Sequence, residues 1–189
     1  MARPENMLKW LWISFVVIFL DQVTKWMAEA QIQYTTKNVP FDGVMREVVA
    51  TVERIPVFDH LNWSFAFNYG AAFNLFGGQR VFLSILAAAV SIVILIWMKR
   101  LKSTERWMAI GLAFVLGGAL GNLIDRVIHG RVIDFIDVYA DWDVFFLNNG
   151  HFATFNVADI AINIGAMILI FGSFFYSEEE VEKPKASNL

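Results

Sequence analysis

Residues 81–98 read VFLSILAAAVSIVILIWM, a run of 18 residues without one charged side chain that ends at Lys99 and Arg100. An α-helix rises about 1.5 Å per residue, so this run is nearly long enough to cross a hydrocarbon core of about 30 Å. The whole chain of 189 residues is 57% hydrophobic and only 17% charged, a composition that excludes both a soluble globular enzyme and a disordered chain. The sequence therefore predicts a small polytopic membrane protein, folded as a single membrane domain over residues 1–189.

Three more apolar runs complete the prediction of an all-α membrane protein with four transmembrane helices. We place the spans at approximately 8–28, 81–98, 107–127 and 155–176. The first span is the least regular, because its apolar run ends at Leu20 and a full crossing must include Asp21 and Lys25. A cleavable signal peptide is the alternative interpretation of this run. We favour a retained anchor, because the segment after Leu20 is long for a cleavage region and carries Lys25 and Trp26.

The short loop between the second and third spans indicates the orientation. Cytoplasmic loops carry an excess of Lys and Arg, and this loop has four such residues against the single acid Glu105, namely Lys99, Arg100, Lys102 and Arg106. Four crossings then place both termini, including the tail 177–189, in the cytoplasm. The remaining loops, approximately 29–80 and 128–154, face the outer side.

The loop before the second span contains a strand pattern. Its aromatic residues Trp63, Phe65, Phe67 and Tyr69 alternate with small or polar residues, which predicts a strand with an aromatic face and so a small outer-face β-rich element. Between residues 44 and 55, valine and isoleucine recur near helical spacing although they are β-branched, and we leave that segment open. The four prolines are expected in loops or termini: Pro4, Pro40, Pro56 and Pro184.

The polar residues of the spans all lie near the outer side. Three helical sets share this depth: Asp21 with Lys25, then Asn122 with Asp125 and Arg126, then Asn156 with Asp159 and Asn163. Asp159 is 17 residues from Tyr176, roughly 26 Å along a helix, which places it just inside the outer boundary of the hydrocarbon. A carboxylate at this depth is usually paired or functional.

Part of this polar set has a purely structural interpretation. Asp21 with Lys25, and Asp125 with Arg126, could be mutual ion pairs that hold helix ends, whereas Asp159 has no cationic neighbour within one turn. The segment 117–121 reads GGALG and contains G-x-x-x-G, which indicates a helix-packing face. A phosphate-binding loop is excluded there, because no strand precedes it and no Lys-Ser/Thr follows.

Asp159 could act together with a second carboxyl group from the loop after the third span. Two carboxyls in a site of low dielectric constant share one proton. The ionised member activates a water and the protonated member polarises a carbonyl, which is aspartic-protease chemistry without metal or cofactor. The loop offers four candidates, of which Asp134 has the most apolar surroundings: Asp134, Asp137, Asp141 and Asp143. Spacing alone does not select Asp134 over Asp137 or Asp125.

Other kinds of site find little support in the sequence. The chain has no cysteine, and its three histidines are scattered (His60, His129 and His151), so no metal site is expected. The net charge is −3 and no basic patch is present, which argues against nucleic acid as a partner.

Five sequence blocks, in order along the chain, resemble lipoprotein signal peptidase, also called signal peptidase II. They are DQVTK at 21–25, FNYGAAF at 67–73, GNLIDR at 121–126, VIDFI at 132–136 and FNVADIAIN at 155–163. The similarity covers about residues 8 to 176. Five ordered blocks are specific, although each alone would be weak.

The resemblance implies a four-helix aspartic endopeptidase of the bacterial inner membrane, with its active site at the periplasmic leaflet. Such enzymes cleave prolipoproteins just before a diacylglyceryl-modified cysteine and bind the cyclic peptide globomycin. The resemblance selects Asp134 and Asp159 as the catalytic pair. It implies that a polar set binds substrate or orients the pair, namely Asn68, Gly70, Asn122, Arg126 and Asn156. Asp21, Lys25 and Asp125 then have structural roles.

Two segments depart from the family pattern, because 27–58 and 137–154 are longer than expected for the family.

Two other classes of protein remain as alternatives. A proton-coupled transporter would need polar groups across the whole membrane, but the inner halves of the spans carry only Ser14, Ser91 and Ser173. A membrane assembly subunit would tolerate neutral replacements of its buried charges. A prepilin peptidase is disfavoured because the expected G-x-G-D motif is absent.

Overall fold

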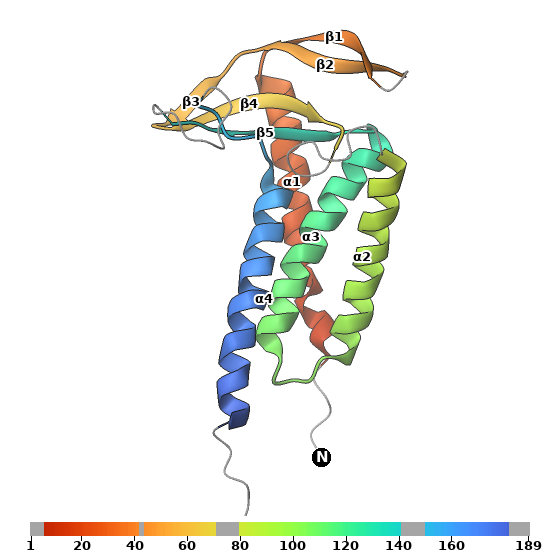
Figure 1. Cartoon of the computed structure of the whole chain (residues 1–189), viewed down its shortest axis with the longest axis vertical. Coiled ribbons are helices and arrows are strands. Elements are labelled where there is room, and N and C mark those ends of the chain that lie inside the picture. The colour runs from red at the N-terminus through yellow and green to blue at the C-terminus, as the bar shows by residue number, and fades with distance from the viewer. Residues whose placement is uncertain (1–5, 42–43, 71–79, 141–149, 182–189) are drawn as a thin grey trace, which may run out of the picture.

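Four helices run side by side and carry small β-sheets across one end (Figure 1). The computed structural model describes residues 6–41, 44–70, 80–140 and 150–181. Within these ranges the chain forms α1 (Leu11–Gln31), preceded by the short 3₁₀ helix η1 (Met7–Trp10), then α2 (Arg80–Arg100), α3 (Arg106–Ile128) and α4 (Val157–Val181).

The helices lie at the four positions where spans were expected. Three helical segments are long and apolar enough to cross a membrane, namely Met7–Gln31, Arg80–Arg100 and Arg106–Ile128, and a shorter apolar stretch covers Val157–Ser173. α4 begins at Val157 because the Asn156 carbonyl accepts the first helical bond, from the Ile160 amide at 3.2 Å. α3 begins at Arg106, directly after its N-cap residue Glu105.

In the described part of the chain, five strands make two antiparallel sheets. β1 (Tyr34–Phe41) pairs with β2 (Val44–Val52), while β4 (Leu61–Asn68) lies between β3 (Ile55–Phe58) and β5 (Val132–Val138). The strand predicted from the aromatic alternation is confirmed as β4. The segment left open between 44 and 55 forms β2 and the first residue of β3, which agrees with its β-branched residues.

The expectation that the prolines avoid regular structure was wrong for two of them. Pro40 lies in β1 and Pro56 in β3. Within the strand pairing that the structure describes, β1 pairs only with β2 and β3 only with β4, so both are edge strands. An edge strand has one side without ladder hydrogen bonds, so it accepts a residue that lacks an N–H donor.

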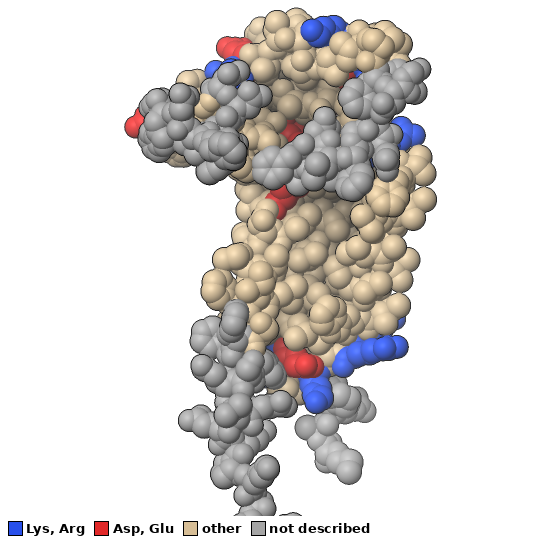
Figure 2. Space-filling view, in the orientation of Figure 1, with Lys and Arg blue, Asp and Glu red and all other residues tan. Residues whose placement is uncertain are grey.

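α1 joins the two hydrophobic clusters of the molecule. Its lower part contributes Ile13 and Val17 to the bundle cluster, and its upper end contributes Ala28 to a second cluster with Phe65 and Phe135 under the sheets. The outward surfaces of the helices remain apolar. Figure 2 shows an uncharged surface over the helices, with charged side chains gathered toward the two ends of that face, as expected for a surface that contacts lipid.

Glycines let α3 approach both of its neighbours, which confirms the packing face predicted at 117–121. A Cβ at Gly117 would lie 2.7 Å from the Val17 side chain of α1, and one at Gly118 would lie 2.3 Å from the Ala158 carbonyl oxygen of α4. Small residues at these positions therefore set how closely the polar ends of α1, α3 and α4 meet.

Replacing Gly118 with Ala is expected to push α3 away from α4. Overpacking of this kind lowers the free energy of unfolding by about 1–3 kcal/mol, measurable as a lower unfolding temperature in detergent. Gly172→Ala is the matched control, because a Cβ there meets its nearest neighbour at an ordinary 3.8 Å. Equal unfolding temperatures for the two variants would contradict this packing argument.

Candidate active site

Asp134 lies in the middle of β5, and its carboxylate is held by two asparagine amides. The side chain is 2% exposed. Asn68 at the end of β4 donates to Oδ2 at 2.9 Å, and Asn156 before α4 donates to Oδ1 at 2.6 Å. Strand pairing brings β4 beside β5 in antiparallel register, with Asn68 opposite Val132. This register places the Asn68 side chain within reach of the carboxylate.

Asp159 lies in the first turn of α4 and takes part in a reciprocal capping arrangement. Its backbone amide donates to Asn156 Oδ1 at 3.0 Å, and its Oδ2 accepts from the Asn156 backbone amide at 3.2 Å. This reciprocal arrangement, a capping box, provides hydrogen-bond acceptors for two backbone amides at the start of a helix. Oδ1 accepts from Asn122 of α3 at 2.9 Å, so both oxygens of the carboxylate have donors.

Asn156 links the two carboxyl groups. It is fully buried, and it contacts Asp134 through its side-chain amide and Asp159 through both side chain and backbone. The same Nδ2 lies 3.1 Å from Asn122 Oδ1. One shared asparagine thus brings together the strand residue and the helix residue that the sequence suggested as a pair.

Burial and a neighbouring carboxylate favour the protonated form of Asp134. Desolvation is the larger cause and the charge of Asp159 the second, and together they raise the pKa of Asp134 from 3.8 to about 7. The hydrogen bonds from Asn68 and Asn156 oppose this rise. The arrangement can hold one proton near neutral pH while keeping its amide donors in place.

Lys25 is the centre of a buried charged cluster behind the two aspartates. Its Nζ lies 2.8 Å from Asp21 Oδ2, 2.8 Å from Asp125 Oδ2 and 3.1 Å from Asn122 Oδ1. Asp21 also accepts from the Ala158 amide at 2.9 Å, which caps the start of α4 from α1. The ion pair of Asp21 with Lys25 is confirmed.

The suggested pairing of Asp125 with Arg126 was wrong. Asp125 instead pairs with Lys25 and accepts from the Ile133 amide at 3.2 Å. Arg126 donates to the Gly70 carbonyl at 2.8 Å and to the Asn122 carbonyl at 3.2 Å. Adjacent residues on a helix point in different directions, so the two side chains reach different partners.

Gln22 belongs to the same polar cluster, and sequence reasoning gave it no role. Its Nε2 donates to Asp125 Oδ1 at 2.9 Å, and it lies 3.2 Å from Asp21 Oδ2. Its position next to Asp21, at the same depth as the other polar residues, could have indicated that Gln22 belongs to this cluster.

The other candidate aspartates are separate from this site. Asp137 is 1% exposed and is bound by Arg54, Asn62 and His151 at 3.2, 3.1 and 2.8 Å. Asp141 and Asp143 lie outside the described residues. Within the described ranges, no group of three or more His, Cys, Asp or Glu side chains could hold a metal ion.

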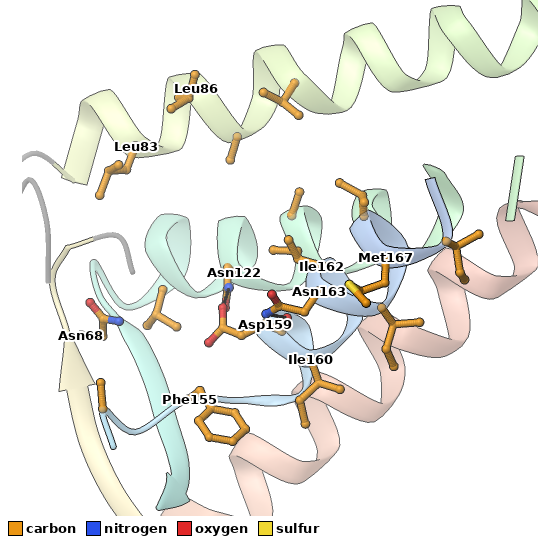
Figure 3. A pocket seen from close by; sticks show the side chains of 18 of the residues that line it. Asn68, Leu83, Leu86, Asn122, Phe155, Asp159, Ile160, Ile162, Asn163 and Met167 are labelled. Carbon is orange, nitrogen blue, oxygen red and sulfur yellow. Dashed lines mark hydrogen bonds between the residues drawn. The ribbon is translucent and has the colours of Figure 1, made fainter. Parts of the chain in front are cut away.

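A groove of about 1490 Å³ leads along the bundle to Asp159. Apolar side chains of α2, α3 and α4 line most of it, and its polar lining gathers at the end near the sheets. Figure 3 shows Asn122 and Asp159 close together in the groove, whose lining also includes Leu83 and Leu86 of α2. The polar residues of that end are Asn68, Asn122, Arg126, Asp159 and Asn163. Asp159 therefore faces the groove, whereas Asp134 lies behind it.

Comparison with known proteins gives consistent matches. Residues 13–175 match the family model described as signal peptidase (SPase) II. The lipoprotein signal peptidase of Acinetobacter baumannii is 38% identical, covering 98% of this chain and 92% of the relative. The one from Pseudomonas paraeruginosa is 41% identical over 88% of each chain. A bacterial membrane enzyme solved by the in meso method at 2.3 Å resolution has a TM-score of 0.73 at 25% identity, covering 100% of this chain and 99% of that chain.

Proposed function

This chain belongs to the signal peptidase II family, and on that premise we propose that Asp134 and Asp159 form the catalytic pair of its reaction. The protein is a multi-pass membrane enzyme, an aspartic signal peptidase that removes signal peptides from prolipoproteins. The assignment of the pair is supported by Asn156, which links a buried carboxyl group of raised pKa, Asp134, to a carboxyl group that faces the groove, Asp159.

In the proposed mechanism Asp134 holds the shared proton and Asp159 is the ionised member. Asp159 takes a proton from a water, whose oxygen attacks the carbonyl carbon of the scissile peptide. Asp134 donates its proton to the carbonyl oxygen, which stabilises the tetrahedral intermediate. The carbon–nitrogen bond then breaks, the amine nitrogen takes up the proton that Asp159 accepted, and Asp134 recovers its proton as the new carboxyl group forms.

The surrounding polar residues divide into two roles. Asn122 and Asn156 bond directly to the aspartates and orient them, and Asn68 has both roles, because it also donates to Asp134. Arg126, which binds the Gly70 carbonyl, lies with Asn68 at the polar end of the groove, where a substrate backbone would offer carbonyl groups. We therefore propose Asn68, Gly70 and Arg126 as substrate-binding residues, and Asp21, Lys25 and Asp125 as structural residues.

The groove suggests how a membrane-embedded substrate reaches the pair. We propose a single membrane domain with four spans and both termini in the cytoplasm, so that the sheets and the site lie at the periplasmic leaflet of the inner membrane. The signal peptide would lie in the apolar groove, with the acyl chains of the modified cysteine in lipid. Globomycin, a cyclic peptide, would occupy the polar end of the groove, where the peptide bond of the substrate would lie.

The substrate assignment is tested by incubating the purified protein with a diacylglyceryl-modified prolipoprotein and with the unmodified form. We expect cleavage of the modified form alone. Cleavage of both forms at equal rates would contradict recognition of the lipid, and no cleavage of either by well-folded protein would contradict the proposed function.

The activity is expected to fall as pH rises through about 7. A carboxyl group with a raised pKa keeps its proton up to that value and loses it above, and the mechanism needs the protonated form. The measurement is kcat/KM against pH between about pH 5 and pH 9, because kcat/KM reports the pKa values of the free enzyme. A rate that stays constant across the alkaline half of this range would contradict the proton-holding role.

Filling the groove is expected to weaken substrate binding. Ala87 of α2 lines the groove, so Ala87→Phe should raise KM about tenfold, equivalent to about 1.4 kcal/mol, while kcat changes little. Ala89→Phe is the matched control, because Ala89 is exposed on the same helix and is not part of the groove lining. Equal KM values for the two variants would contradict this placement of the substrate.

A further inference from the structure

The β1–β2 hairpin is a sheet of its own, above the bundle and separate from the three-stranded sheet that carries Asn68 and Asp134 (Figure 1). It covers residues 34–52. Two side chains of β2 reach the residues beside the site: Glu47, through an ion pair with Arg131, and Arg46, whose guanidinium lies 5.2 Å from the centre of the Tyr69 ring.

Glu47 is bound to Arg131 and Tyr69. Arg131 Nη1 lies 2.7 Å from Glu47 Oε2 and 3.3 Å from the Tyr69 hydroxyl, and that hydroxyl donates to the Glu47 carbonyl at 2.6 Å. The Arg131 guanidinium also stacks 3.4 Å from the centre of the Phe67 ring. The Arg131 side chain is 21% exposed and the Glu47 side chain 42% exposed, so the pair is partly open to water and its hydrogen-bond geometry, more than its charge, fixes the position of Tyr69.

Tyr69 lies between two residues of the site. Asn68, immediately before it, donates to Asp134, and Gly70, immediately after it, accepts from Arg126. The Gly70 amide also donates to Asn68 Oδ1 at 2.9 Å, which fixes the orientation of the Asn68 amide. β4 ends at Asn68, so beyond this residue the strand ladder no longer holds the chain.

From these contacts we infer that Glu47, Arg131 and Tyr69 form a positioning cluster, through which the β1–β2 hairpin holds Asn68 and Gly70 against the catalytic pair. This inference rests on the proposed function. The three residues touch neither of the two aspartates in any contact that the described part of the chain records. They act through the Asn68–Asp134 and Gly70–Arg126 hydrogen bonds.

The first test is Glu47→Gln, which removes the charge and keeps the shape. We expect kcat to fall about tenfold, with KM within a factor of about two and the unfolding temperature nearly unchanged. Lys37→Gln is the matched control, because Lys37 is an exposed cation on the same hairpin, and it should retain wild-type kcat. Tyr69→Phe, which removes only the hydroxyl, should reproduce the loss.

The second test separates positioning from general stabilisation. Losing the Asn68 hydrogen bond favours the protonated form of Asp134, since that bond lowers its pKa, so Glu47→Gln should move the alkaline fall in kcat/KM to higher pH. Asp159, Lys25 and Arg126 also act on this carboxyl group by their charges, and none of them is changed. In an Asn68→Ala background, Glu47→Gln should have no further effect on kcat or on the pH profile.

The outcomes distinguish the inference from the proposed function. If wild-type protein cleaves the lipidated substrate and Glu47→Gln matches it in both kcat and pH profile, the inference is overturned and the proposed function stands. An additive loss in the Asn68→Ala background would also overturn it, because the hairpin would then act by another route. If the wild type does not cleave, both fail together.

Discussion

Asp159→Asn and Asp134→Asn should each abolish cleavage of a lipidated prolipoprotein, with a rate loss of about 10³-fold or more. Asn at 159 can still accept from the Asn156 amide and preserve the helix start, but it cannot take a proton from water. Asn at 134 occupies the same volume but carries no acidic proton for the carbonyl. The measurement is single-turnover cleavage under saturating enzyme, with folding checked by thermal unfolding.

Asp137→Asn is the matched control for both variants. Asp137 is on the same strand as Asp134, is equally buried and is also hydrogen-bonded, yet its partners lie away from the groove. We expect it to cleave within about tenfold of wild type. Cleavage at the wild-type rate by Asp134→Asn or Asp159→Asn would contradict the assignment of the catalytic pair. A loss of activity in Asp137→Asn as large as in those two variants would contradict it as well.

Lys25→Met should cause the largest loss of stability among single substitutions in the polar cluster. Its side chain is 3% exposed and lies 2.8 Å from both Asp21 and Asp125. Removing it leaves two buried carboxylates without a compensating cation, a change that costs about 3–5 kcal/mol. The measurement is thermal or chemical unfolding in detergent, together with the yield of folded protein.

Lys99→Met provides the comparison for this substitution. Lys99 is an exposed lysine at the other end of the bundle, where replacing a surface charge changes stability by less than about 0.5 kcal/mol. A Lys25→Met protein that unfolds at the same temperature as Lys99→Met would show that the buried carboxylates have another source of compensation.

The helices could be predicted because uncharged runs of this length leave few alternatives, and β4 because its aromatic residues alternate with period two. The β1–β2 hairpin could not be predicted, because the valines of β2 recur near helical spacing. Only the pairing of β2 with β1 decides that this segment is a strand and not a helix. Residue spacing also could not show which of Asp134 and Asp137 pairs with Asp159. An odd separation puts them on opposite faces of β5, but which face meets α4 depends on the sheet's placement over the bundle.

The pairing within the polar cluster depends on three helices at once. Sequence neighbours suggested Asp125 with Arg126, yet Lys25 reaches Asp125 from α1 because small residues bring α1 close to α3. Such a contact is set by how closely two helices pack, which periodicity alone does not determine. The polar residues were correctly expected at one end of the bundle, because charges deep in lipid are too costly elsewhere.

The central claim is that a water placed by Asp134 and Asp159 hydrolyses the bond just before the lipidated cysteine. The most direct test is a single turnover with wild-type enzyme in heavy-oxygen water, followed by mass spectrometry of both products and of the enzyme. We predict a cut immediately before the modified cysteine and the heavy oxygen in the new carboxylate of the released signal peptide. A cut at another position, or heavy oxygen in the carboxyl group of Asp134 or Asp159, would contradict the claim.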